Sequence, residues 1–438
     1  MKEQMNVPKL RFDEFDTQWK PMPLGEITSY LKGFAFKSED YLSSGHADSR
    51  LIRVSDLSSE SVKIDNQKVF LPKELMESST KYKLKDDDVL ITTVGSKPEL
   101  RESAVGRAIY INKAHGYLNQ NLLIMRPKGE HLPRFIFSQL NTPRYINHIT
   151  NIQRGNANQS NITVVDLFEY RVSTTSLPEQ QKIVSFLSKV DEKVTLLTEK
   201  KNKLTEYKKG VMQQLFNGSF QEQDGQLTFI PPTLRFKADD GSEFPDWEER
   251  KLGELGQFKN GLNKGKEDFG FGSPFVNLQD VFGKQVISST SNLGLVNASD
   301  KDIDLYQLLK GDVIFIRSSV KKSGVGETAL VEKNLVKTVY SGFLIRFRSN
   351  TDLTDNYKKY CFWEKRFRNK LIAMSTTSAN TNINQESLSQ LTIPCPSQDE
   401  QTKIANFLSS IDQKIDLVSS ELEKTKEWKK GLLQQMFV

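Results

Sequence analysis

Apolar residues recur at alternating spacings of three and four in two long stretches of this chain. One stretch runs from Glu179 to Phe216 and the other from Glu400 to Phe437. Such spacing marks the seam of a coiled-coil helix, because it keeps one face apolar over many turns. Lys201 and Lys208 interrupt the first series, and Asn217-Gly218 is typical of the C-terminal end of a helix. The seam residues are Ile183, Leu187, Val190, Val194, Leu197, Leu204, Val211 and Leu215, then Ile404, Leu408, Ile411, Ile415, Val418, Leu422, Leu432 and Met436.

The two stretches also align with each other without a gap. PEQQKIVSFLSKVDEKV in the first faces DEQTKIANFLSSIDQKI in the second, and EYKKGVMQQLF faces EWKKGLLQQMF. Fainter matches continue upstream, where Arg11 and Trp19 recur as Arg235 and Trp247, and YKLKDDDVLITTVGS (82–96) faces YQLLKGDVIFIRSSV (306–320). Elsewhere the copies diverge almost completely. The chain is therefore one architectural unit written twice, in which a shared frame carries two different surfaces.

The two predicted helices are natural partners for each other. A seam of this kind on a lone helix would leave apolar residues in water. Because the helices end equivalent copies, we expect them to pack antiparallel. The alternative, in which each helix packs only on its own domain, stays open at this point.

The remainder of each copy predicts a mixture of strands and helices. DVLIT, RAIYI, DVIFI and LIRF are short apolar runs typical of buried strands, whereas RFIFSQLNTPRYINHI and YKKYCFWEKRFRNKLIAM are helical in period. The fold class is therefore α+β, with two mixed α/β domains, each followed by a long helix, and an internal pseudo-two-fold duplication. The expected boundaries are 1–176 for the first domain, 177–217 for its helix, 218–231 for a polar linker, 232–397 for the second domain and 398–438 for its helix.

Catalytic chemistry is not apparent in either copy. All four histidines lie in the first copy and both cysteines in the second, so no imidazole or thiol chemistry is common to the two. Two cysteines cannot form a zinc ribbon, and Gly261–Lys266 lacks the spacing of a phosphate-binding loop. Asp86-Asp87-Asp88 suits a turn and strand entry better than catalysis. We expect no catalytic residue, no metal and no cofactor on this chain.

Composition leaves the choice of partner open. The net charge of +6 permits a nucleic-acid partner without requiring one. No stretch approaches the roughly 20 apolar residues of a membrane span, and the N-terminus lacks the apolar core of a signal peptide. We therefore expect no membrane partner and a cytoplasmic location.

Two polar loops in each copy are candidates for binding DNA. Amide and hydroxyl side chains hydrogen-bond to base edges, and basic side chains hold phosphates. The alternative is that these loops are simply solvated, but they recur at matching places with different sequences. The candidate residues are Thr93, Ser96, Lys97, Arg154, Asn156, Asn158, Gln159 and Asn161 in the first copy, and Arg317, Ser318, Ser319, Lys321, Lys322, Thr377, Ser378, Asn380 and Asn382 in the second.

With these features together, the chain resembles the specificity subunit of type I restriction–modification systems. The similar features are the entry motif PxLRF…W…LGE, the strand GDVIFIRSS, the loop GNANQSNI, and LPEQQKIVSFLSKVDEKV…KKGVMQQLF. The resemblance covers nearly the whole chain. The second copy departs from the pattern at Asp399, where proline is usual, and in STTSANTNIN, which lacks the glycine and glutamine of the first loop.

The resemblance implies a reader of double-stranded DNA. Each domain would be a target recognition domain that reads one half of a split sequence, while the helices fix the spacing and dock two methyltransferase subunits. S-adenosylmethionine would bind the methyltransferase, and ATP and Mg would bind separate restriction and translocase subunits. The target bases do not follow from the sequence.

Three other interpretations remain at this point. The chain could be an enzyme with divergent motifs, or a scaffold that joins two partners without DNA. It could also serve a related system whose methyltransferase and nuclease share one partner chain.

Overall fold

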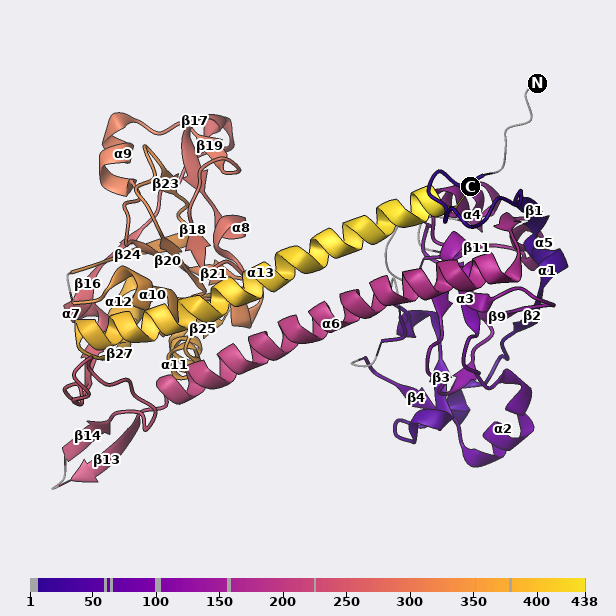
Figure 1. Ribbon diagram of the computed structural model, residues 1–438. Helices are drawn as coiled ribbons and strands as arrows, with labels where there is room; N and C mark the ends of the chain where they lie inside the picture. Colours follow the sequence, from indigo (N-terminus) through magenta and orange to yellow (C-terminus); the bar gives the residue numbers. More distant parts are fainter. Residues whose placement is uncertain are drawn as a thin grey trace. The chain divides into compact units, whose positions relative to one another are not determined.

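The computed structural model describes residues 7–58, 61–63, 66–98, 104–155, 159–223, 226–350, 352–377 and 380–437. The chain divides into two compact units. The first unit comprises Met1–Thr198 with Ser420–Val438, and the second comprises Glu199–Ser419. The long helices α6 (Leu177–Leu215) and α13 (Gln398–Met436) each contribute to both units (Figure 1). Within the described ranges, no helix combines the length and apolar character needed to cross a membrane.

The first unit is built on a four-stranded antiparallel sheet of order β2-β9-β5-β7. Val89 and Ile91 face one core together with α3, α4 and α5, while Leu90 faces a second core with Ile109 and Ile124. DVLIT and RAIYI therefore form buried strands, as predicted. The elements are β2 (Thr28–Lys32), β9 (Leu122–Pro127), β5 (Val89–Thr92), β7 (Ala108–Tyr110), α3 (Pro133–Gln139), α4 (Pro143–Ile152) and α5 (Val164–Phe168), with a smaller sheet of β4 (Val69–Phe70), β3 (Arg50–Ile52) and β8 (Tyr117–Leu118).

The second unit repeats this plan with one more strand. Its five-stranded sheet has the order β16-β24-β20-β22-β18, and a smaller sheet has the order β19-β17-β23. Phe315 and Phe347 face a core shared with the helices, whereas Ile314 and Leu344 face the opposite side. The elements are β16 (Gly256–Asn260), β24 (Leu344–Ser349), β20 (Val313–Ile316), β22 (Thr328–Val331), β18 (Val286–Ile287), β19 (Gly294–Val296), β17 (Phe269–Val276), β23 (Val339–Tyr340), α10 (Asp355–Cys361), α11 (Lys365–Met374) and α12 (Gln385–Gln390).

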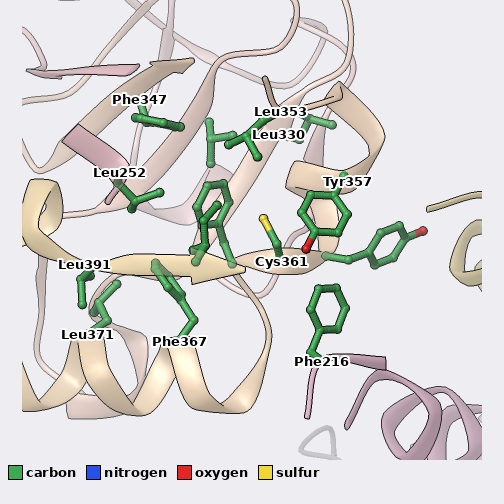
Figure 2. Packing of buried hydrophobic residues seen from close by; sticks show 14 of the residues in the cluster. Phe216, Leu252, Leu330, Phe347, Leu353, Tyr357, Cys361, Phe367, Leu371 and Leu391 are labelled. Atoms are coloured by element: carbon green, nitrogen blue, oxygen red, sulfur yellow. The ribbon is translucent and has the colours of Figure 1, made fainter. Parts of the chain in front are cut away.

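Figure 2 shows how the core of the second unit reaches the long helices. The Tyr357 ring lies beside the buried thiol of Cys361, and Phe347 and Phe367 belong to the same cluster. Phe216, just beyond the end of α6, packs against this core, with its ring centroid 5.8 Å from that of Tyr357. The C-terminal end of α6 is therefore part of the second unit's core.

Each of the two stretches that are helical in period forms two helices, α3 and α4 in the first unit and α10 and α11 in the second. In the first unit, Asn141 has a φ of 62° and Thr142 caps α4, accepting a hydrogen bond from the Tyr145 amide. Pro143 then occupies the first helical turn, where a missing N–H does no harm. In the second unit, Glu364 caps α11 by accepting from the Arg366 and Phe367 amides. Local capping therefore overrides the continuous apolar period in both units.

The two long helices run antiparallel in the first unit. Ile183 and Leu187 of α6 share a core with Leu432 and Met436 of α13. Because early residues of α6 meet late residues of α13, the chains run in opposite directions. Asp191 of α6 also pairs with Lys429 of α13, with Oδ1 2.6 Å from Nζ.

The same arrangement recurs in the second unit. Val211 and Leu215 of α6 share a core with Ile404 and Leu408 of α13. Lys208, which interrupts the apolar series, places its Nζ 2.5 Å from Asp412 Oδ1. In the alignment of the copies, Lys208 is equivalent to Lys429 and Asp191 is equivalent to Asp412. The same ion pair between the two helices therefore occurs once in each unit. The predicted antiparallel pairing and pseudo-two-fold duplication are confirmed.

All seam residues are buried or half-buried. Val194, Leu204 and Ile415 are half-buried. The fully buried members are Ile183, Leu187, Val190, Leu197, Val211, Leu215, Ile404, Leu408, Ile411, Val418, Leu422, Leu432 and Met436.

The segment between the copies contains a β-hairpin that the sequence analysis did not predict. β13 (Ser219–Gln223) and β14 (Gln226–Ile230) pair antiparallel. The Arg366 guanidinium lies 4.8 Å from the centroid of the Phe220 ring and donates to the Gly218 carbonyl. A Cβ at Gly218 would lie 2.1 Å from the Phe229 ring, so a larger residue here would displace that ring. Figure 1 shows the hairpin near the end of α6.

Candidate nucleic-acid interface

The repeated sequence motifs form a clamp at the start of each long helix. In the first unit, Glu179 is fully buried and accepts hydrogen bonds from Arg11 Nε at 2.7 Å, Arg11 Nη2 at 2.9 Å and Trp19 Nε1 at 3.1 Å. Thr175 Oγ1 donates to the same carboxylate. Burial tends to raise the pKa of Glu179, but the hydrogen bonds from Arg11, Thr175 and Trp19 and the Arg11 charge outweigh it and lower this pKa.

The second unit holds the same clamp. Glu400 accepts from Arg235 Nε at 3.0 Å, Arg235 Nη2 at 2.7 Å and Trp247 Nε1 at 2.8 Å. The next residue also acts alike in both units, because Gln180 Oε1 accepts from the Leu132 amide and Gln401 Oε1 accepts from the Thr354 amide. The glutamate at the start of each long helix therefore holds the segment that precedes the domain, which contains Arg11 or Arg235. The glutamine after it holds the residue just before a helix of the domain, α3 or α10.

Where each domain begins and ends, its two end strands pair. β1 (Lys20–Pro23) pairs antiparallel with β12 (Arg171–Thr174) in the first unit. β15 (Glu248–Lys251) pairs in the same way with β27 (Thr392–Cys395) in the second. The chain therefore enters and leaves each domain at one place.

A second repeated motif anchors the strand that leads to a candidate loop. Asp88 accepts from Arg126 Nε at 2.6 Å and Nη2 at 2.9 Å, and Asp312 accepts from Arg348 Nε and Nη2 at 2.7 Å each. Each carboxylate also accepts the amide three residues before it. The acidic residues at this turn are therefore structural, as predicted for Asp88.

The two candidate loops of the first unit meet in a small ribbon. β6 (Val94–Gly95), β11 (Ser160–Asn161) and β10 (Arg154–Gly155) form a three-stranded antiparallel sheet. The Ile162 amide donates to the Thr93 carbonyl at 3.0 Å, and the Thr93 amide donates to the Asn121 carbonyl at 2.9 Å. Loops about 65–70 residues apart in sequence are thus joined by backbone hydrogen bonds.

The second unit builds an equivalent ribbon from unrelated residues. β21 (Ser318–Ser319), β26 (Thr381–Asn382) and β25 (Thr376–Thr377) form the sheet. The Ile383 amide donates to the Arg317 carbonyl at 3.0 Å, and the Arg317 amide donates to the Phe343 carbonyl at 2.9 Å. Arg317 therefore takes the place that Thr93 holds in the first unit.

Among the candidate residues of the first unit, Arg154 and Asn161 lie on the strands of its ribbon, and Ser96, Lys97 and Gln159 follow or precede these strands. Lys97, Arg154, Gln159 and Asn161 are exposed, and Ser96 is half-buried. Arg154 Nη2 donates to Asp166 Oδ2 at 2.9 Å. Thr93 is buried, so its side chain is not presented to a ligand. Asn156 and Asn158 lie outside the described residues.

The candidates of the second unit follow the same pattern. Lys321, Lys322 and Asn380 are exposed, while Arg317, Ser318, Ser319 and Asn382 are half-buried. Arg317 Nη1 donates to the Gly342 carbonyl at 3.3 Å. Ser378 and the side chain of Thr377 lie outside what the structure describes.

Both ribbons carry cations, of which Arg154 is paired with Asp166. The segments 93–97, 153–161, 317–322 and 375–384 contain no Asp or Glu. Their cations are Lys97, Arg154, Arg317, Lys321 and Lys322. A polar, basic surface of this kind suits a polyanion that also carries hydrogen-bonding groups.

One position on each ribbon was missed by the sequence analysis. Asn121 and Phe343 occupy the turn that accepts the hydrogen bond from Thr93 and Arg317, respectively. This turn carries no motif, and only the register of β9 and β24 makes the two residues equivalent. Among the described residues, no group of three or more His, Cys, Asp or Glu could hold a metal ion.

Comparison with known proteins agrees with this arrangement. The family model described as type I restriction modification DNA specificity domain matches twice, at residues 17–206 and 245–427. The chain is 25% identical to the putative type I restriction enzyme MjaX specificity subunit of Methanocaldococcus jannaschii, with 98% of this chain and 95% of that protein covered. It is 22% identical to the type I restriction enzyme EcoKI specificity subunit of Escherichia coli K12, with 92% and 84% covered.

Solved structures share the fold. The type I restriction–modification S subunit from M. genitalium superimposes with a TM-score of 0.55 at 16% identity, with 99% of each chain covered. A chain from a study of complex assembly and conformational transition of the type I R-M system gives a TM-score of 0.54 at 16% identity, with 95% and 97% covered. Because the family model matches most of the sequence and matches it twice, the chain belongs to the family of type I restriction–modification DNA specificity subunits and carries two recognition domains.

Proposed function

We propose that this chain reads a bipartite DNA target, with one half-site for each unit, and has no catalytic activity of its own. The observation that carries this proposal is the pair of ribbons. Each is built on the same backbone frame, but each presents different side chains. Two equivalent frames with different surfaces are what two half-sites of unrelated sequence require.

The ribbons divide the work of recognition by chemistry. Lys97, Lys321 and Lys322 are exposed cations that can hold phosphates without selecting a sequence. Gln159 and Asn380 are exposed amides that can bind adenine edge-on in the major groove through two hydrogen bonds. The phosphate contacts position each unit, and the amides contribute to its choice of bases.

The paired helices would dock two methyltransferase subunits. Leu196 and Trp428 are each at least half exposed in the first unit, as are Leu417 and Tyr207 in the second. Leu196 is equivalent to Leu417, and Tyr207 is equivalent to Trp428, in the gapless alignment of the copies. Each unit thus presents one leucine and one aromatic ring from opposite helices. Exposed apolar residues at equivalent positions of both units suit two copies of one partner.

The remaining chemistry belongs to partner chains in this proposal. The methyltransferase would bind S-adenosylmethionine and flip the target adenine from the duplex. Restriction and translocase subunits would bind ATP and Mg. The complex would act in the cytoplasm, where the chromosome lies.

Methylome sequencing tests the proposed function. The chain is expressed with its methyltransferase in a host that lacks other DNA methyltransferases. We expect a split motif with N6-methyladenine in each half, absent when this chain is omitted. A methylome that does not depend on the chain, although the complex assembles, would contradict DNA reading and favour a scaffold.

Native mass spectrometry tests the docking surfaces. Leu196→Ser and Leu417→Ser should each reduce the number of bound methyltransferases from two to one, and the double variant should bind none. Lys203→Ser and Lys424→Ser are the matched controls, because these exposed residues are equivalent to each other on the same helices. Two methyltransferases still bound to the double leucine variant would contradict this docking surface.

A matched deletion tests whether the helices set the spacing of the half-sites. Each helix has 39 residues and is about 58 Å long at 1.5 Å per residue. Half-sites one helical turn apart are separated by about 34–36 Å. Removing one seven-residue repeat from both helices should change the spacer of the methylated motif or abolish methylation. An active variant with an unchanged spacer would refute this role.

A further inference from the structure

We propose that the second unit recognises thymine through the apolar side chains of Phe343 and Val320, which contact the thymine 5-methyl group in the major groove. This inference rests on the proposed function, because it concerns how the ribbon of the second unit selects bases. It assigns a specificity-determining role to two residues that carry no recognisable motif.

Phe343 lies at the edge of the ribbon with its ring in solvent. It occupies the turn between β23 and β24, and 57% of its surface is exposed. Its backbone is held firmly, because its carbonyl accepts from the Arg317 amide and its own amide donates to Ser341 Oγ at 3.3 Å. The turn therefore presents an aromatic ring from a fixed position beside Arg317.

Val320 is a second exposed apolar residue at the same ribbon. It directly follows β21, and 85% of its surface is exposed. The next two residues, Lys321 and Lys322, are exposed cations. Val320 is therefore an accessible apolar group beside two cations, and a ligand that offers both negative charge and an apolar group would match this combination.

The first unit carries polar residues at both positions. Asn121 stands where the second unit has Phe343, as the strand registers and the matching hydrogen bonds show. Ser96 stands where the second unit has Val320 in the alignment of the copies. Two polar-to-apolar differences at one surface change what that surface can bind, while the shared frame stays the same.

DNA offers one apolar group at the base edges of its major groove, the 5-methyl group of thymine. Phosphates on either side of the groove supply the negative charge that Arg317, Lys321 and Lys322 can pair with. A protein partner with an apolar surface would match Phe343 and Val320 but not the cations beside them. The combination therefore favours DNA that contains thymine.

The test replaces thymine with deoxyuridine, which removes only the methyl group. The complex of this chain with its methyltransferase is titrated with duplexes that carry the identified target. All thymines of one half-site are replaced at a time. For the wild-type chain, we expect replacement in one half-site to weaken binding about fourfold for each methyl group contacted, as burial of one such group predicts.

The Phe343→Ala, Val320→Ala double variant should lose this discrimination. It should bind the thymine and deoxyuridine duplexes about equally, while replacement in the other half-site keeps its wild-type effect. Phe271→Ala is the control, because Phe271 is another exposed aromatic residue of the second unit, on β17 and not on the ribbon or its turn. The control variant should keep the wild-type preference for thymine.

Three results would overturn the inference. The wild-type chain could bind both duplexes equally, or the double variant could keep the full preference for thymine. The double variant could also fail to bind the methyltransferase in the absence of DNA, which would make Phe343 and Val320 part of a protein interface. A wild-type complex with no preference for any sequence would instead overturn the proposed function itself.

Discussion

Replacing Glu179 should lower the stability of the first unit and leave that of the second unit unchanged. We consider Glu179→Gln, which keeps the size of the side chain but removes its charge and one acceptor oxygen. The carboxylate is fully buried and receives donors from Arg11, Trp19 and Thr175. In the variant, an amide group would face donors that need an acceptor.

The expected loss of stability follows from these contacts. Breaking a buried ion pair by removing one partner costs about 3–5 kcal/mol. Arg11 keeps 12% side-chain exposure and still donates to the Thr17 carbonyl, which favours the lower end of this range. We therefore expect the first unit to lose about 3 kcal/mol of unfolding free energy. For a unit of this size, that loss lowers its melting temperature by about 6–12 °C.

Hydrogen–deuterium exchange gives the assay, and the duplication supplies the control. Glu179→Gln should speed exchange in β1 and the first turns of α6, while the clamp of the second unit keeps its protection. Glu400→Gln should speed exchange in β15 and the first turns of α13, while the clamp of the first unit keeps its protection. A loss below about 1 kcal/mol, or equal effects of either variant on both clamps, would refute this account of the clamp.

Three further predictions concern acid stability and the helix seam. The pKa of Glu179 is lowered on folding, so the stability it contributes is present above its ordinary value of 4.5 and is lost as the pH falls through the lower folded value; exchange measured against pH should therefore show a weaker acid dependence of the first unit in Glu179→Gln. Leu187→Ala should cost about 2–5 kcal/mol in urea unfolding because this side chain is buried in the seam, whereas Lys189→Ala on the exposed face should cost less than about 0.5 kcal/mol. Asp412→Ala should cost about 3 kcal/mol in the second unit because it leaves Lys208 partly buried without its ion pair, and an unchanged denaturation midpoint would contradict this role.

The sequence predicted the elements whose signal is long and periodic. The seams of α6 and α13 repeat over many turns, so their faces could be assigned residue by residue. Lys208 could only be recorded as an interruption, because its partner Asp412 comes from the other helix and no local pattern connects them. The split between α3 and α4 was missed because capping by Thr142 and the positive φ of Asn141 act within a few residues of one continuous apolar period.

The pairing of the ribbon strands could not be predicted from the sequence. Their loops could be selected because they are polar and recur in both copies, but strands of two residues have no periodicity to detect. Their pairing depends on backbone hydrogen bonds between segments about 65–70 residues apart, such as the bond from Ile162 to Thr93. The turn at Phe343 was missed for the same reason, since only the register of β24 against β20 brings it beside Arg317. The DNA contacts of all these residues stay predictions.

The pairing of β1 with β12, and of β15 with β27, makes each domain an insertion whose two ends meet. Everything between Pro23 and Arg171 could be exchanged for another sequence of different length, provided that the new segment begins and ends at this pair of strands. Arg11, Trp19, Thr175 and Glu179 of the clamp and the paired helices lie outside the exchanged part, so the new segment would have to supply only the contacts that Leu132, Arg134 and Phe135 make with them. If each domain reads one half-site as proposed, recombination at two short junctions would exchange one half of the target in a single event and leave the other domain and the paired helices in place.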